Sequence, residues 1–357
     1  MTSLIEVISL IHIQSYLWTG LVLVLVMSTL SSKFFSKVTD KFIKNYDNVQ
    51  RIHHEEVSRL GGVALTFGVL MLAYLSDNPE TQALTLKLFI ALTPITLVAL
   101  MEDLHLEISP FFRLSVLLLS SFLVLLLTDI ELPKLNEARL DLLLSMPYLG
   151  LFFYSLCIAG LINGMNFIDG TNGNFGFTSI AILMGLLFLG MTANDLAFIS
   201  LLLTFLMPLI IFMAFNYPLG KIFAGDVGAY FFGASIGFLV IYFFGSHPEI
   251  SAWNAVLIVF YPAMELIYSV TRKVAKNYSP LLPDRHHLHI KLYGRLFNLT
   301  QNAKTSNNLV TLMLSPFWLL PMLLLPWVYH SAVLSMSTAT ALALLYIVLN
   351  KVIRSPL

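Results

Sequence analysis

Long apolar runs alternate with short polar segments along the chain. A helix needs about 17 to 25 residues to cross the hydrocarbon layer of a membrane. Eleven runs approach or reach this length: 16–35, 60–76, 84–101, 112–128, 148–164, 175–192, 196–215, 227–245, 252–270, 309–329 and 331–350. They are too long and too apolar for barrel strands, so the pattern predicts an all-α polytopic membrane bundle of about eleven helices.

The composition agrees with this pattern. The 357 residues are 57% hydrophobic and 11% charged, with a mean hydropathy of +0.82, whereas soluble domains carry roughly 25% charged residues. One cysteine, Cys157, excludes an intramolecular disulfide. No basic stretch precedes the first run, so we expect that helix to be retained. With no soluble domain or repeat visible, we predict a single transmembrane domain over residues 1–357.

The net charge of zero hides a strong asymmetry. If eleven helices alternate in direction, all but three of the 20 lysine and arginine residues fall on one side; the exceptions are Lys87, Lys134 and Arg139. The positive-inside rule makes the basic side cytoplasmic. We therefore expect a protein of the plasma (inner) membrane with its N-terminus outside and its C-terminus inside.

The polar segments between the runs hold most of the acids, amides and histidines. They are 51–62, 101–113, 163–173, 221–228 and 284–295, and the same alternation places all of them on the cytoplasmic side. This gathering indicates an enzyme. A transporter or permease is the alternative, although transporter sites tend to lie near the bilayer midplane. A non-enzymatic scaffold would leave the polar set unexplained.

Segment 163–173 has the most distinctive pattern. Asn163, Asn166 and Asp169 recur at every third position, and Gly170 and Gly173 then interrupt the helix. Glycines allow a ligand to approach the backbone closely, and polar residues at lipid depth are functional candidates. The alternative is a polar helix end followed by an ordinary glycine turn.

Glu102 and Asp103 close the third apolar run, and Arg113 opens the fourth. Acids are unfavourable at a helix C-terminus, which prefers cations. A divalent cation would compensate them, and an interfacial acidic turn is the alternative.

Asp226 lies between Gly225 and Gly228, with Lys221 shortly before it. Asp is a favoured N-cap, so a simple cap is one interpretation. The other is a carboxylate that holds a metal ion while a basic group meets phosphate.

The basic loop contains Asp284-Arg285-His286-His287-Leu288-His289. With a single cysteine and no second histidine cluster, zinc fits poorly. Phosphate contact by imidazolium and guanidinium groups fits better, with a solvated basic loop as the alternative. Glu265, inside the ninth run, either braces the bundle or lines the site.

Together these residues resemble the polyprenyl-phosphate N-acetylhexosamine-1-phosphate transferases, the MraY- and WecA-like superfamily of glycosyltransferase family 4, and are closer to the WecA-type branch. The matches occur in family order within about 50–296. They are Arg59-Leu60-Gly61-Gly62, Glu102-Asp103, Asn163 with Asn166, Asp169, Gly170 and Gly173, Phe223-Ala224-Gly225-Asp226-Val227-Gly228, and Asp284-Arg285 with His287 and His289.

The resemblance implies transfer of a sugar 1-phosphate, an N-acetylhexosamine such as GlcNAc, from a UDP-sugar to undecaprenyl phosphate. The products are UMP and a sugar diphospholipid, in the first membrane step of cell-envelope polysaccharide synthesis. The cofactor expected is Mg²⁺, with Mn²⁺ as an alternative. The partners expected are the two substrates and membrane lipid, with no nucleic acid, and a homodimer is left open.

The resemblance also assigns roles. It implies catalysis by Asp103, Glu102 and Asp169, and a metal held by Asp226 and Asp169. It implies substrate contacts from Arg59, Asn163, Asn166, Gly170, Lys221, Arg285, His287 and His289.

Three positions depart from the family pattern. Glu102 stands where an aspartate is usual, which favours Asp103 as the catalytic member of the pair. Asn172 stands where an acid is frequent, and Ile290 where a histidine is usual.

Overall fold

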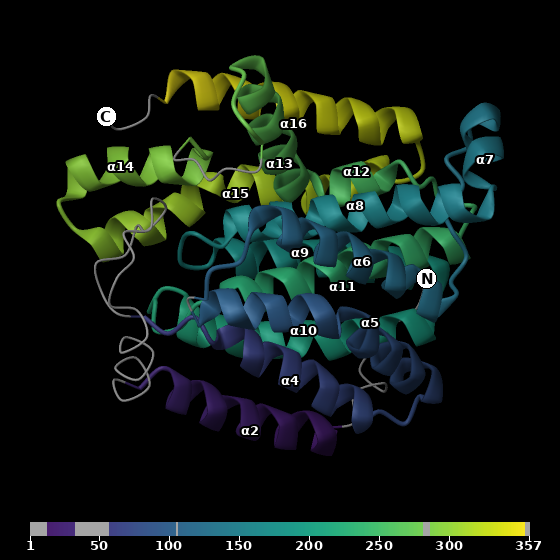
Figure 1. The fold of residues 1–357 in the computed structure, drawn as a ribbon, viewed down its shortest axis with the longest axis horizontal. Coiled ribbons are helices and arrows are strands. Elements are labelled where there is room, and N and C mark those ends of the chain that lie inside the picture. The colour runs from purple at the N-terminus through teal and green to yellow at the C-terminus, as the bar shows by residue number, and fades with distance from the viewer. Residues whose placement is uncertain (1–12, 33–56, 105, 281–285, 354–357) are drawn as a thin grey trace.

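The computed structural model describes residues 13–32, 57–104, 106–280 and 286–353. Within these ranges every regular element is helical, which confirms the all-α prediction (Figure 1). The helices are α2 (Ile13–Leu30), α4 (Gly61–Tyr74), α5 (Pro79–Asp103), α6 (Pro110–Thr128), α7 (Ala138–Leu144), α8 (Pro147–Ile168), α9 (Asn174–Ala193), α10 (Leu196–Asn216), α11 (Gly225–Ser246), α12 (Asn254–Ile258), α13 (Phe260–Ala275), α14 (Leu288–Thr300), α15 (Ala303–Val328) and α16 (Ala332–Val352).

Each of the eleven apolar runs contains a helix, but the helices differ in length. Eight described helices are long and apolar enough to cross a membrane: α5, α6, α8, α9, α10, α11, α15 and α16. Two more, Gln14–Leu30 and Gly61–Tyr74, are shorter apolar helices. The run at 252–270 is broken at Val259 into α12 and α13. The structure therefore establishes a polytopic helical protein with eight candidate spans, and the count of eleven and the orientation stay predictions.

α11 is the central helix of the bundle. In its apolar window 94% of the residues are buried inside the protein, against 22% for α16. It packs against α8, α5 and α4, and the close contact with α4 depends on glycine. A Cβ on Gly62 would lie 2.0 Å from the backbone nitrogen of Gly228. The N-terminus of α11, which carries Asp226, is thereby held among several helix ends.

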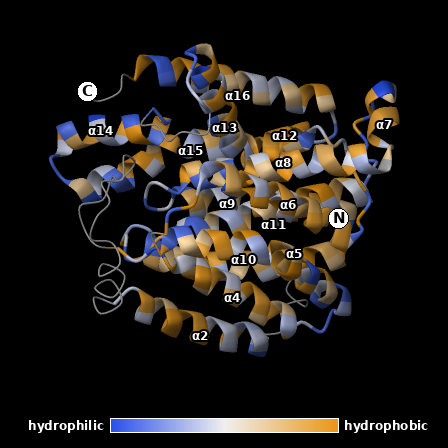
Figure 2. Ribbon diagram, viewed as in Figure 1, coloured by the Kyte–Doolittle hydropathy of each residue, from blue (hydrophilic) through white to orange (hydrophobic). Residues whose placement is uncertain are grey.

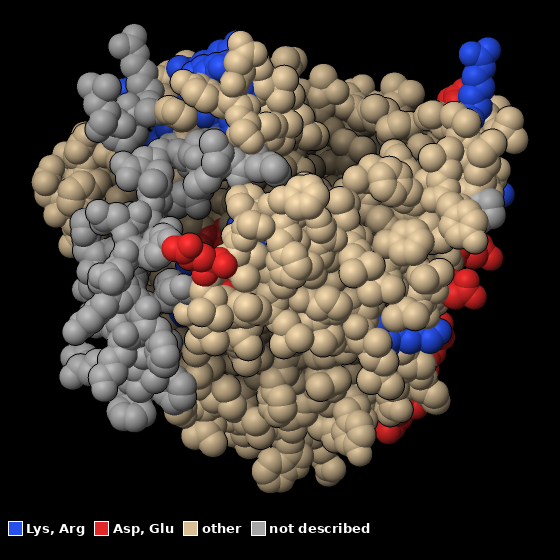
Figure 3. All heavy atoms as spheres, viewed as in Figure 1, with Lys and Arg blue, Asp and Glu red and all other residues tan. Residues whose placement is uncertain are grey.

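The distribution of hydrophobic and charged residues also fits a bundle that lies in a membrane. Hydrophobic colours run along the long helices, and hydrophilic ones gather toward their ends and on α14 (Figure 2). The face seen in Figure 3 is almost free of charged side chains at its centre. The pattern of runs did not predict α7 or α14. α14 is amphipathic and buries Leu288, His289, Lys291 and Leu292.

Candidate active site

Asp226 stands in the first turn of α11, directly after a tight backbone junction. Gly225 has φ +66°, and a Cβ there would lie 2.2 Å from the Arg59 carbonyl oxygen and 2.7 Å from both Asp103 carboxylate oxygens. The preceding strand-like segment pairs with the residues before α4, since the Phe223 nitrogen donates to the Ser58 carbonyl over 2.9 Å. Only glycine combines this φ with so close an approach. The junction joins two of the predicted segments.

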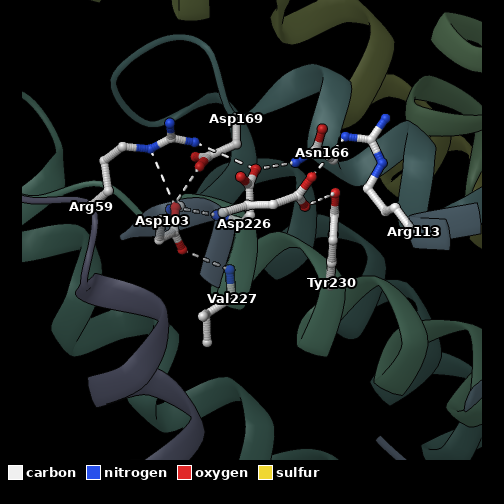
Figure 4. Close-up of polar contacts among 10 residues, drawn as sticks. Arg59, Asp103, Arg113, Asn166, Asp169, Asp226, Val227 and Tyr230 are labelled. Carbon is white, nitrogen blue, oxygen red and sulfur yellow. Dashed lines mark hydrogen bonds and ion pairs between the residues drawn. The ribbon is translucent and has the colours of Figure 1, made fainter. Parts of the chain in front are cut away.

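The Asp103 carboxylate ends α5 against the N-terminus of α11. Its Oδ1 accepts from the Asp226 backbone nitrogen and its Oδ2 from that of Val227, each over 2.9 Å (Figure 4). The first N–H groups of a helix have no partner within the helix, and an anion is stabilised there. Asp103 supplies this anion from another helix, and its side chain is 0% exposed.

The Asp226 carboxylate points into the polar cluster. Its Oδ1 accepts from Asn166 Nδ2 over 2.6 Å and from Arg59 Nη2 over 3.4 Å, and Arg59 Nε also lies 3.4 Å from Asp103 Oδ1. The Asp226 side chain remains 17% exposed. Of these two aspartates, Asp226 is therefore the one that a ligand can reach.

Asp169 follows the end of α8 and reaches the same junction, where its Oδ2 accepts from the Gly225 nitrogen over 2.9 Å. Burial raises the pKa of Asp169 well above its ordinary value, although the Arg59 guanidinium opposes this effect. The carboxylates of Asp226, Asp103 and Asp169 together raise the pKa of Arg59, against the opposing effect of its burial.

Glu102 has its own partners. Its Oε1 accepts from Arg113 Nη1 and its Oε2 from the Tyr230 hydroxyl, each over 3.0 Å. The sequence suggested that a metal ion compensates the Glu102–Asp103 pair. In the structure Arg113 meets Glu102, while Arg59 and the N-terminus of α11 meet Asp103, so the pair does not by itself require a metal.

The whole cluster nevertheless suits a cation. It contains four carboxylates (Glu102, Asp103, Asp169, Asp226) and two guanidinium groups (Arg59, Arg113). Fully ionised, it carries an excess of two negative charges. Among the described residues, no three His, Cys, Asp or Glu side chains form a ready-made metal site. Mg²⁺ commonly takes one or two protein carboxylates and completes its shell with water and substrate phosphate, and Asp226 with Asp169 fits that requirement.

The histidines divide into two kinds. His287 and His289 are each 3% exposed, whereas His286 is exposed. His289 lies beside the turn after α8, because a Cβ on Gly170 would be 2.6 Å from His289 Nε2. Burial lowers the pKa of His289 to about 4. The expectation of an imidazolium is therefore revised for this residue, which is neutral near pH 7.

Some predicted site residues lie apart from the cluster. Asn163 Nδ2 donates to the Ala159 carbonyl of its own helix over 3.0 Å, and Lys221 is exposed ahead of the α11 junction. Arg285 lies outside the described residues. No observation tests the roles assigned to individual residues, and those assignments stay predictions.

Two features escaped the sequence reasoning. Tyr230 partners Glu102, and its position four residues after Asp226 on one helix was the available signal. Asn172, a departure from the family pattern, braces α15. Its backbone nitrogen donates to Asn307 Oδ1 over 2.6 Å, and its Nδ2 donates to Asn308 Oδ1 over 2.9 Å.

Comparison with known proteins agrees with the resemblance. The family model described as glycosyl transferase family 4 matches residues 85–244, somewhat less than half of the chain. This stretch contains Glu102, Asp103, Asn166, Asp169 and Asp226. The chain is a relative of glycosyl transferase family 4.

Curated relatives extend the similarity. A Thermotoga maritima protein is 26% identical over 273 residues, which cover 76% of this chain and 79% of the relative. An Escherichia coli (strain K12) protein is 25% identical over 284 residues, covering 76% and 75%. Both are named undecaprenyl-phosphate alpha-N-acetylglucosaminyl 1-phosphate transferase. The resemblance stated from the motifs is thereby confirmed.

Proposed function

We propose that this protein transfers a sugar 1-phosphate, most simply GlcNAc 1-phosphate, from a UDP-sugar to undecaprenyl phosphate. The names of the curated relatives support this reaction. An oxygen of the lipid phosphate attacks the sugar-side phosphorus of the donor. The diphosphate bond to UMP breaks, UMP leaves with the bridging oxygen, and a sugar diphospholipid remains.

The observation that carries the proposal is the convergence of three carboxylates at helix ends, Asp103 buried and the other two partly buried. Asp226, Asp169 and Asp103 come from separate helix ends and meet at one backbone junction with Arg59. A transporter site is expected near the bilayer midplane instead. This cluster sits where α5 and α8 end and where α4 and α11 begin, so the geometry favours an enzyme at the rim of the bundle.

Each side chain then has a task. Asp226, with Asp169, would hold Mg²⁺. Bound there, the ion would neutralise diphosphate charge that repels the incoming lipid phosphate. Asn166 fixes the Asp226 carboxylate, and the part-exposed Arg59 guanidinium is available to a phosphate oxygen.

Asp103, for which the resemblance implied a catalytic role, receives a positioning role here. Both of its oxygens already accept from the α11 backbone, so we propose that it positions Asp226. A strong base is not required, because a phosphate monoester has a second pKa near about 6 and is largely ionised at neutral pH. His287 and His289 would contact the sugar diphosphate from α14.

The expected location is the plasma membrane, with the site open to the cytoplasm. Ser109→Cys and Gln301→Cys in a Cys157→Ser background test this, since both positions are exposed. They should resist impermeant thiol reagents applied to intact cells, and Lys134→Cys should react. Reaction of both site-side cysteines from outside overturns the orientation.

The reaction itself is tested with purified protein, undecaprenyl phosphate, Mg²⁺ and a panel of UDP-sugars. UMP should appear only when lipid phosphate and one N-acetylated donor are both present, and a chelator should stop it. No UMP from any donor in the panel would refute the proposal.

A further inference from the structure

A buried carboxylate–histidine pair joins α13 to the start of α14. Glu265 Oε2 lies 3.1 Å from His287 Nδ1, and the two side chains are 1% and 3% exposed. Placing a carboxylate so deep is costly unless it is paired and hydrogen-bonded. The sequence left two roles open for Glu265, bracing the bundle or lining the site, and in the structure it contacts His287 at the start of a neighbouring helix.

The carboxylate lies deep in the bundle. The side chains of Tyr261, one turn earlier on α13, and Tyr346, on α16, lie close to it, and among the described residues its Oε1 has no hydrogen-bond partner. The Tyr261 hydroxyl in turn accepts from Asn174 Nδ2 over 3.1 Å, at the first residue of α9. Glu265 therefore lies among residues of α13 and α16, and its hydrogen bond is to His287, the N-cap residue of α14.

The pair determines which ring nitrogen of His287 is available. A carboxylate at Nδ1 fixes the proton on that atom and the orientation of the ring, so Nε2, on the other edge, is the nitrogen left for a ligand. The His287 ring packs on Phe167, with centroids 4.7 Å apart, and on His289 at 5.7 Å. Phe167 directly follows Asn166, so the oriented ring lies beside the segment that holds Asn166 and Asp169.

We infer that Glu265 is a positioning residue of this site, which orients His287 so that Nε2, protonated in the imidazolium form, donates to an oxygen of the donor's diphosphate. The inference rests on the proposed function and adds to it a residue outside the motifs that carry the resemblance. Glu265 touches no substrate in this scheme; it acts through His287.

The first test separates the hydrogen bond from the volume of the side chain. Glu265→Met keeps a similar size without an acceptor, and it should lower kcat/KM for the UDP-sugar by roughly 10- to 100-fold, the usual effect of losing such an orienting partner. The KM for undecaprenyl phosphate should change little. Glu265→Gln keeps an oxygen that can accept from Nδ1, and it should retain most of the activity.

The chain provides a matched control. His247 Nδ1 lies 3.2 Å from Glu249 Oε1 at the other end of α11, with the Glu249 side chain 64% exposed. Glu249→Met should leave kcat/KM unchanged. Wild-type kcat/KM in a folded Glu265→Met variant overturns the inference, as does an equal loss in Glu265→Gln and Glu265→Met.

A double-mutant cycle tests whether Glu265 acts through His287. Residues that act as a unit are non-additive, so Glu265→Met in a His287→Ala background should cause no loss beyond that of His287→Ala alone. Losses that multiply mean that Glu265 has an independent structural role, and the inference fails. If Glu265→Met does not fold, Glu265→Gln is used instead, and nitrogen-15 NMR of its labelled histidines must show a hydrogen-bonded Nδ1 proton on His287; absence of that proton overturns the inference.

Different results would overturn the proposed function and the positioning role of Glu265. A wild-type protein that releases no UMP from any donor overturns the proposed function. An active wild-type protein whose Glu265 variants behave like the Glu249 control overturns only the positioning role.

Discussion

The two ends of α11 use the same residue types in different ways. At its C-terminal end, His247 lies 3.0 Å from Asp195 Oδ2 and 3.2 Å from Glu249 Oε1, and a cavity of about 490 Å³ is lined partly by Glu80 and Asp129. That cavity is open and its acids are not drawn into one cluster. At the N-terminal end, Asp226 stands among buried and partly buried carboxylates from other helix ends, each with a specified backbone or side-chain partner.

This difference shows that acids and histidines alone do not identify a site. What distinguishes the N-terminal end is burial combined with contacts between residues far apart in sequence. Asp226 Oδ1, for example, meets groups 60 and 167 residues away. Holding several carboxylates together costs free energy through mutual repulsion and lost hydration, and a bound cation with its phosphate ligand is a physical reason to retain them.

The strongest test of this contrast is Asp226→Asn. Removal of the reachable carboxylate should lower turnover by ~10³-fold or more, because several kcal/mol of transition-state stabilisation are lost. UMP release at saturating Mg²⁺ measures it. Asp129→Asn is the matched change at the opposite end, in a left-handed position that asparagine tolerates, and should leave turnover unchanged. Near wild-type turnover of Asp226→Asn would contradict the assignment.

The buried state of His289 predicts a pH dependence of stability. Its pKa in the folded protein is about 4, below the ordinary 6.5, so the unfolded chain binds the proton more readily. The stabilisation is complete above pH 6.5 and is lost as the pH falls toward 4, amounting to about 3 kcal/mol. Unfolding in detergent from pH 7 to 4 should show a smaller decline for His289→Gln than for the wild type. Parallel declines would show that His289 is not buried as a neutral ring.

Alanine substitutions of the three neighbouring histidines should differ in their effect on activity, because two of the side chains are buried and one is exposed. His287→Ala and His289→Ala should each lower kcat/KM by roughly 10- to 100-fold, the effect of losing a contact to a charged group. His286→Ala, at an exposed position, should change it little. A defect in His286→Ala as large as the other two would mean that the motif register is shifted by one residue.

The smallest expected effect concerns the helix contact that supports the site. Gly62→Ala places a methyl group 2.0 Å from the Gly228 nitrogen, whereas a Cβ on Gly185 meets its nearest neighbour, Leu325, at 3.5 Å. Overpacking costs typically about 1–3 kcal/mol, so Gly62→Ala should lower the thermal stability and Gly185→Ala should not. Equal melting temperatures would show that α4 and α11 can separate without cost.

Much of this architecture could be predicted from the chain alone. The apolar runs are long and continuous, so the helices follow from them, and the family motifs bring together Asp103, Asp169 and Asp226. Local sequence signals were enough to place these aspartates at helix ends, because each motif lies where a helix ends or begins. The break at Val259 was not predicted, because the apolar run continues through it. Pro262, in the first turn of α13, was the available signal.

The detailed contacts could not be predicted, because they depend on how distant helices pack. Asp103 looked like a metal-compensated acid, yet the structure places it against the N–H groups of α11. Asn174 directly precedes the apolar run at 175–192, yet it is buried and donates to Tyr261. Both outcomes follow from the position of α11 in the centre of the bundle, which no local pattern encodes.

The central claim is that this end of the bundle breaks the diphosphate bond of a UDP-sugar for a lipid phosphate. Product analysis by mass spectrometry, with the accepted UDP-sugar and undecaprenyl phosphate, tests it most directly. The predicted result is UMP and sugar diphospholipid in equal amounts, with both reduced by ~10³-fold or more in Asp226→Asn. Release of UDP, or of UMP without a lipid product, would show that a different bond is broken or that water is the acceptor, and would contradict the account.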